Sequence, residues 1–146
     1  MASLASLDDI NVHLPSDKLG LADGDDTEMQ LDAERIIKGY LSTVYSAATL
    51  AEWADPATTP GLIRAIAGRL IAAFYYALRF SEDSVERPEY AQFKYDEAMS
   101  MLKQIVAGTL LLPEVTETPT TGLSFTSADF WPNDDDPVFT MSKEFA

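Results

Sequence analysis

Residues 59–80, TPGLIRAIAGRLIAAFYYALRF, decide the fold that we expect for this chain. The opening Thr59 and Pro60 are typical of a helix start, with threonine as the N-cap and proline at the first helical position, where its missing N–H costs nothing. Apolar side chains then continue on nearly every side of the helix to about Phe80. A helix this apolar predicts either burial at the centre of a bundle or coverage by a neighbouring subunit.

Two helices are expected before this central one. Ser6, followed by acids that favour a helix N-terminus, predicts the N-cap of a short helix that ends at Pro15. Its apolar face consists of Leu7, Ile10 and Leu14. After a loop at residues 16–26, Thr27–Gln30 fits a capping box and predicts a second helix. The apolar face of the second helix consists of Ala33, Ile36, Ile37, Tyr40, Leu41 and Val44.

A further short helix, capped by Thr49 and ending at Asp55–Pro56, is expected just before the central helix. After it, Pro88 begins the last helix and Gly108 ends it. The apolar stripe of the last helix consists of Phe93 or Tyr95, Ala98, Leu102, and Ile105 or Val106. Residues 110–113 then either pack back on the helices or leave the domain. The expected fold class is all-α: a small bundle of about four helices in residues 1–113, followed by an extended C-terminal arm at residues 114–146.

The composition predicts a packed domain with acidic ends. The chain has 146 residues, of which 47% are hydrophobic, and it carries a net charge of −14. Residues 1–34 hold nine acids and one base, residues 35–113 hold eight of each, and residues 114–146 hold seven acids and one base. Acidic flanks repel phosphates, so we expect no direct binding of DNA or RNA. The charge fits a basic partner, or a surface that must not adhere to nearby DNA.

The residues that usually carry catalysis are scarce. The chain has no cysteine, and its single histidine is His13, which excludes thiol chemistry and a site with several histidine ligands. His13 is expected to be structural or exposed at the end of the first helix, where an imidazolium would favour the helix dipole. No nucleophile motif or glycine-rich phosphate loop is present. We therefore expect no enzyme activity, no catalytic residue, and no cofactor or metal.

Two acidic runs contain side chains of the kind that bind divalent cations. Four side chains fall at the first, third, fifth and twelfth positions of a helix-loop-helix calcium site: Asp23, Asp25, Thr27 and Glu34. The sixth position, however, is Glu28 where the turn requires glycine. The contiguous run Asp134–Asp136 points its side chains in different directions. Solvated or partner-facing charge is the favoured interpretation of both runs.

Three arginines lie in the central helix: Arg64, Arg69 and Arg79. They disfavour a membrane span, and we expect no membrane partner. If the helix is buried, these side chains either reach water or pair with acids of the same chain such as Glu97. Alternatively, they contact the acidic flank of the next subunit, which makes them candidate charge contacts between subunits. Both alternatives stay open at this point.

The arm combines prolines and acids with single apolar side chains. Six of these are candidate contacts with a partner protein or a neighbouring subunit: Phe125, Phe130, Trp131, Val138, Phe139 and Phe145. Such a segment has too few contiguous apolar residues to form its own core. Leu123–Thr126 and Val138–Met141 are short and apolar enough to add a strand to the sheet edge of another chain. We therefore expect the arm to dock on a partner.

Four stretches carry a resemblance to a known family. They are the opening LDDINVHL at residues 7–14, the acidic loop before the helix at residues 28–40, the entry TPGLI at residues 59–63 to an alanine-rich helix, and the closing residues 95–112. The most characteristic positions of the last stretch are Ala98, Leu102, Ile105, Gly108 and Leu111. Over roughly residues 7–113, the pattern resembles the head–tail connector (adaptor or head-completion) proteins of tailed bacteriophages.

The resemblance implies a structural virion protein that is made in the host cytoplasm and lies in the neck, between capsid and tail. In this family, small helical bundles form a dodecameric ring beneath the portal and join the DNA-filled head to the next neck or tail component. DNA passes through the lumen without specific binding, which an acidic lumen favours. The alternative is an acidic decoy that mimics DNA and occupies the basic groove of a host nucleic-acid-binding protein. The decoy explains the charge but not the arm.

Overall fold

Helices make up most of the part of the chain that the computed structural model describes, which is residues 3–14, 25–79 and 89–120. The helices are α1 (Leu7–Asn11), α2 (Asp25–Leu41), α3 (Ala47–Glu52), α4 (Gly61–Arg79) and α5 (Glu89–Val106). No strand lies within these described ranges. The expected all-α helical bundle is confirmed; α1 and α3 are short, and α2, α4 and α5 are the long helices.

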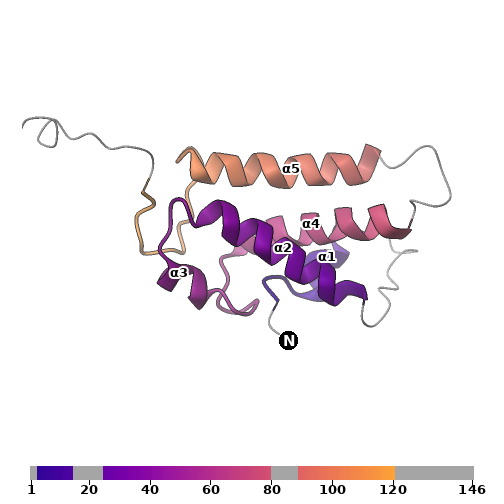
Figure 1. The fold of residues 1–146 in the computed structure, drawn as a ribbon, viewed down its shortest axis with the longest axis horizontal. Coiled ribbons are helices and arrows are strands. Elements are labelled where there is room, and N and C mark those ends of the chain that lie inside the picture. Colours follow the sequence, from indigo (N-terminus) through magenta and orange to yellow (C-terminus); the bar gives the residue numbers. More distant parts are fainter. Residues whose placement is uncertain (1–2, 15–24, 80–88, 121–146) are drawn as a thin grey trace, which may run out of the picture.

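Helix α4 occupies the centre of the bundle. It lies beside α5 along its whole length, α2 crosses it, and α1 packs on it as well (Figure 1). Its core side chains are 1% exposed or less: Ile63, Ile66, Ala67, Leu70, Ile71 and Ala72. Phe74 is only partly buried, against Tyr95, and Leu78 is 56% exposed. Burial by the chain's own helices is therefore the explanation of its apolar composition that the structure supports.

The first helix has the predicted cap and a shorter apolar face than predicted. Ser6 Oγ accepts the Asp9 N–H at 3.2 Å, and Asp9 Oδ2 accepts the Ser6 N–H at 2.8 Å, which completes a capping box. Ile10 and Leu14 are buried, but Leu7 is 56% exposed, so its assignment to the core was wrong. The helix ends at Asn11, before Pro15, and the core is completed instead by Leu4 and Ala5, which precede the cap.

Two predicted helix starts were also wrong. Helix α2 begins at Asp25, so Thr27 lies in its first turn rather than at its N-cap. Helix α3 is capped by Ser46, whose Oγ accepts the Thr49 N–H at 3.3 Å, and the helix ends at Glu52 rather than at Asp55–Pro56. In both cases a capping residue type stands just inside the helix as well as before it, so local pattern alone selects the wrong one.

The start of α4 differs from the prediction for a tertiary reason. Thr59 Oγ1 donates to the Asp55 carbonyl at 2.7 Å and does not cap the helix. Pro60 precedes the first helical residue, and its carbonyl accepts the Arg64 N–H at 3.0 Å. The N–H of Gly61 is bonded instead by a side chain 53 residues away. Long-range capping of this kind leaves no mark in the local sequence.

The remaining helix faces follow the predicted periodicity with one exception. On α5, Ala98, Leu102 and Ile105 are 1% exposed or less. Of the two alternatives at the start of this stripe, Tyr95 packs against the core and Phe93 is 61% exposed. On α2, Tyr40 is 37% exposed, in contrast to its predicted core position. The other predicted α2 core positions are buried or half-buried: Ala33, Ile36, Ile37, Leu41 and Val44.

The chain turns back on the bundle after α5. Gly108 has a φ of 77°, the left-handed conformation in which glycine ends helices without strain. Leu112 is 5% exposed, so residues 110–113 pack back on the helices rather than leaving them.

By length and composition alone, Gly61–Leu78 of α4 could cross a membrane. A buried core helix passes the same test, and 56% of this stretch is buried within the protein.

Candidate assembly interface

The six candidate contacts of the arm lie outside the described residues: Phe125, Phe130, Trp131, Val138, Phe139 and Phe145. The stretches Leu123–Thr126 and Val138–Met141 lie outside them too. The geometry that bears on assembly is therefore that of the segment leading into the arm, residues 109–120, which we call the clasp segment.

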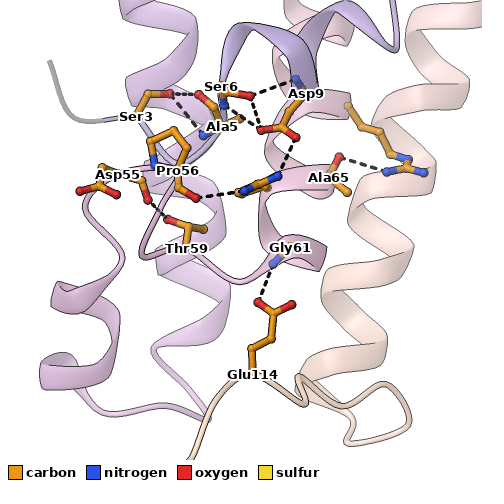
Figure 2. A network of polar contacts seen from close by, with 12 residues as sticks. Ser3, Ala5, Ser6, Asp9, Asp55, Pro56, Thr59, Gly61, Ala65 and Glu114 are labelled. Carbon is orange, nitrogen blue, oxygen red and sulfur yellow. Dashed lines mark hydrogen bonds and ion pairs between the residues drawn. The ribbon is translucent and has the colours of Figure 1, made fainter.

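One end of the clasp segment is fastened at the start of α4. Glu114 Oε2 accepts the Gly61 N–H at 2.9 Å, and Figure 2 shows the Glu114 side chain pointing at this amide. The first amides of a helix have no partner within the helix, and the positive end of the helix dipole attracts a carboxylate. Val115 is half-buried beside this contact in sequence. Glu114 thus supplies the cap that the sequence had assigned to Thr59.

The other end is fastened at the start of α3. The Glu117 carboxylate accepts the Ser46 N–H at 3.1 Å, the Ser46 hydroxyl at 3.0 Å and the Thr49 hydroxyl. The pKa of Glu117 is lowered, mainly because its carboxylate accepts the hydrogen bond from Thr49. Thr120 N–H then donates to the Val44 carbonyl at 2.9 Å. Two carboxylates three residues apart therefore hold the segment on the N-termini of two helices.

These contacts bear on where the arm begins. The sequence placed the start of the arm at residue 114, but residues 114–120 lie against the helical body and cap two of its helices. The last described residue, Thr120, is therefore fixed next to Val44, in the turn after α2.

Two of the three arginines of α4, Arg64 and Arg69, have partners within the chain. Arg64 Nη2 lies 3.3 Å from Asp9 Oδ1, and its Nη1 donates to the Pro56 carbonyl at 3.1 Å. Arg69 Nε lies 3.1 Å from Glu97 Oε2, so of the two alternatives that the sequence left open, the structure shows for Arg69 the pairing with an acid of the same chain. Arg79 is the last residue of α4, and its side chain is not among those described.

Lys94 joins the same group of charges, with its Nζ 3.4 Å from Glu97 Oε2. Burial disfavours the ionised form of Glu97, but the hydrogen bond and charge of Arg69, together with Lys94, outweigh burial and lower the pKa of Glu97. Burial likewise acts to raise the pKa of Asp9, but the hydrogen bonds from Ser6 and the charge of Arg64 outweigh it, so this pKa is also lowered. These half-buried pairs form a charged layer between α1, α4 and α5.

His13 lies in this layer and not on the surface, because it is only 8% exposed. Burial, followed by the charges of Arg69 and Lys94, lowers its pKa. The expectation that an imidazolium is favoured here by the helix end is therefore wrong: α1 is too short to offer much dipole, and burial together with Arg69 and Lys94 outweighs the opposing charges of Glu97 and Asp9.

Cation sites find no support in the described residues. Residues 25–34 are part of α2, so this stretch does not form the loop that a helix-loop-helix calcium site requires. Asp23 and Asp134–Asp136 lie outside the described ranges. Within those ranges, no three histidine, aspartate or glutamate side chains converge as a metal site would require.

Sequence reasoning missed three contributors to this region: Gly68, Glu114 and Glu117. Gly68 had a usable signal, because glycine inside an apolar helix costs about 1 kcal/mol and often marks a close packing contact. The glutamates had none, because an acid after a helix does not reveal which distant helix end it will cap.

Comparisons with protein-family models, with curated protein sequences and with solved structures find no match to this chain.

Proposed function

We propose that this chain is a structural virion protein, a head–tail connector subunit that forms a ring under the portal and joins the DNA-filled capsid to the neck. The observation that carries the proposal is the clasp segment. It fastens the chain to the helical body up to Thr120 and leaves the last 26 residues, with all six candidate contacts, to follow from one defined place.

An arm whose first residues are already held on the helical body docks more readily on a partner. Ordering a segment on a partner costs conformational entropy, and this cost is lower when one end of the segment is already held in position. Aromatic side chains are the usual anchors of such interfaces. Phe130, Trp131 and Phe139 are the anchors that we propose for contact with the portal or a neighbouring subunit.

The distribution of charge supports a place beside DNA. Exposed acids lie on the first two helices, where Asp8, Glu28 and Asp32 all face solvent. Such a surface repels phosphates, so a duplex passes it without adhering. The resemblance of the helical pattern to the connector family supports the same assignment.

In this proposal the ring rests mainly on surfaces other than the core face of α4, because that face is covered by the chain's own helices. Arg64 and Arg69 are likewise paired internally, so their proposed contacts across subunits would be additional to those pairs. The arm is therefore the part of the chain on which assembly depends in this proposal.

Co-sedimentation with purified portal rings tests the proposal. The full chain is expected to sediment with the rings, and a truncation after Thr120 is expected not to. This truncation keeps Glu114 and Glu117, so both helix caps remain and the body stays folded. The triple variant Phe130→Ala, Trp131→Ala and Phe139→Ala controls for arm length and should also fail to bind.

A full chain that stays in the supernatant would contradict the connector function. Unchanged sedimentation of the truncated chain would show that the arm is passive. The decoy alternative makes a different prediction: a monomer or dimer that ignores portal rings and displaces DNA from a basic DNA-binding protein.

A further inference from the structure

The N-terminal helix α1 packs on α4 at a place with no spare room. A β-carbon on Gly68 would lie 2.5 Å from the Asp9 carbonyl oxygen, closer than real contacts of this kind. Ile10 and Leu14 are buried in the same contact region of the core. Backbone and side chains of α1 therefore meet α4 at van der Waals distance, and small changes at this contact affect whether α1 stays docked.

His13 lies inside this contact. Its Cδ2 would be 3.4 Å from the same β-carbon position, and its carbonyl oxygen accepts the Tyr90 hydroxyl of α5 at 2.5 Å. The charged groups that face its ring come from all three helices: Asp9 of α1, Arg69 of α4, and Lys94 and Glu97 of α5. Protonation of the His13 ring would therefore add a positive charge to a half-buried cluster of charged side chains.

The carboxylates of this cluster are already engaged. Glu97 lies 3.1 Å from Arg69 and 3.4 Å from Lys94, so it serves two cations. Asp9 lies 3.3 Å from Arg64 and also bonds Ser6. Among the described residues, a protonated His13 would therefore join Arg69 and Lys94 without a carboxylate that is not already paired, and half-buried charge without a partner is costly.

We propose that His13 is a proton-sensitive latch: α1 is docked while the imidazole is neutral, and protonation of His13 loosens α1 from α4 and α5. This proposal concerns the helical body and stands independently of the connector function.

The direction of the pH effect follows from linkage. Because burial and the neighbouring cations lower the pKa of docked His13 below its ordinary 6.5, the undocked form takes up the proton first. Docking is therefore at full strength above pH 6.5 and weakens as the pH falls, by at most about tenfold per pH unit. The weakening stops once the docked histidine also becomes protonated.

The test uses the full chain, in which His13 is the single histidine and gives one resolvable set of ring signals by NMR. Amide hydrogen exchange is followed from about pH 7.5 to about pH 5, corrected for intrinsic chemistry. The Ile10 amide, which donates to Ser6, reports on α1, and the Leu102 amide in the buried stripe of α5 is the internal reference. Exchange at Ile10 is expected to rise relative to Leu102 as the pH falls below 6.5.

Two variants make the outcome decisive. His13→Gln takes up no proton in this range, so its Ile10 exchange should be independent of pH even if α1 is looser throughout. Lys94→Gln removes one repelling cation, raises the pKa of His13 and should reduce the pH effect. Asp9 and Glu97, with pKa values lowered from 3.8 and 4.5, ionise outside the window.

Two results would overturn the proposal. The first is a His13 ring that titrates at or above its ordinary pKa in the intact chain. The second is an unchanged pH response of Ile10 exchange in His13→Gln.

Discussion

The two segments at the ends of the described chain, residues 3–14 and the clasp segment 109–120, are attached to the same helical body by different physics. The first is buried: Leu4, Ala5, Ile10 and Leu14 are all 5% exposed or less, and its backbone touches α4 at Gly68. The second buries Leu112 and is also held by carboxylates on the N-termini of α3 and α4.

The two kinds of attachment are expected to contribute different amounts to the stability of the fold. Burying one large aliphatic side chain stabilises a fold by about 1.5–3 kcal/mol, whereas one helix cap contributes about 1 kcal/mol. Removal of apolar volume should therefore damage the N-terminal attachment far more than loss of a cap damages the C-terminal one. The two attachments should also respond to different ranges of pH.

The largest effect is expected for Ile10→Ala. Ile10 is fully buried, so its truncation removes apolar contacts and leaves a cavity, at a cost of about 2–5 kcal/mol in the free energy of unfolding. Val12→Ala is the matched control, because Val12 is 78% exposed and should change stability by less than about 0.5 kcal/mol. Urea unfolding measures both, and equal losses would place Ile10 outside the core.

A smaller loss is expected for Gly68→Ala. The added β-carbon meets the Asp9 backbone, which cannot rotate away, and overpacking of this kind costs about 1–3 kcal/mol. Gly39→Ala is the control on α2: nothing lies within 4 Å of its β-carbon, so the gain in helix propensity should stabilise by about 0.5–1 kcal/mol. Thermal melts in which both variants shift in the same direction would refute the close contact.

Loss of a cap should cost less again. Ser46→Ala removes the N-cap of α3 and one partner of Glu117, with an expected loss of about 1 kcal/mol. Ser42→Ala is the control, because this exposed serine only donates back to the Gly39 carbonyl and should change stability by less than about 0.5 kcal/mol. Urea unfolding distinguishes the two, and a Ser46 loss as large as that of Ile10 would contradict the comparison.

The smallest expected effect is a difference in the pH at which α1 and the clasp segment detach from the helical body. The pKa of Glu117 is lowered from 4.5, mainly by the Thr49 hydrogen bond, so its contribution is complete above pH 4.5 and is lost as the pH falls through the lowered value. The clasp segment should therefore hold through the range in which His13 loosens α1. Exchange of the Thr120 amide, which donates to Val44, measures this release. Simultaneous release of both segments would show that they are one cooperative unit.

Some contacts of the candidate site could be predicted from the sequence, and others could not. Three arginines in an apolar helix require partners, and Glu97 was a correct candidate for Arg69. The pairing of Arg64 with Asp9 depends on α1 folding against α4, a contact 55 residues apart that no local pattern encodes.

The sequence by itself determined the helices and most of their buried faces. Helical hydrogen bonds join residues four apart, and burial selects every third or fourth side chain, so Ile63, Leu70 and Leu102 could be assigned from spacing alone. Only the tertiary structure decided which groups complete the helix ends and the charged layer. Folding brings the Glu114 carboxylate to the Gly61 N–H, and it brings Arg69 and Lys94 close enough to His13 to lower its pKa. These residues are far apart in the sequence, so a short-range pattern carries no information about their contacts.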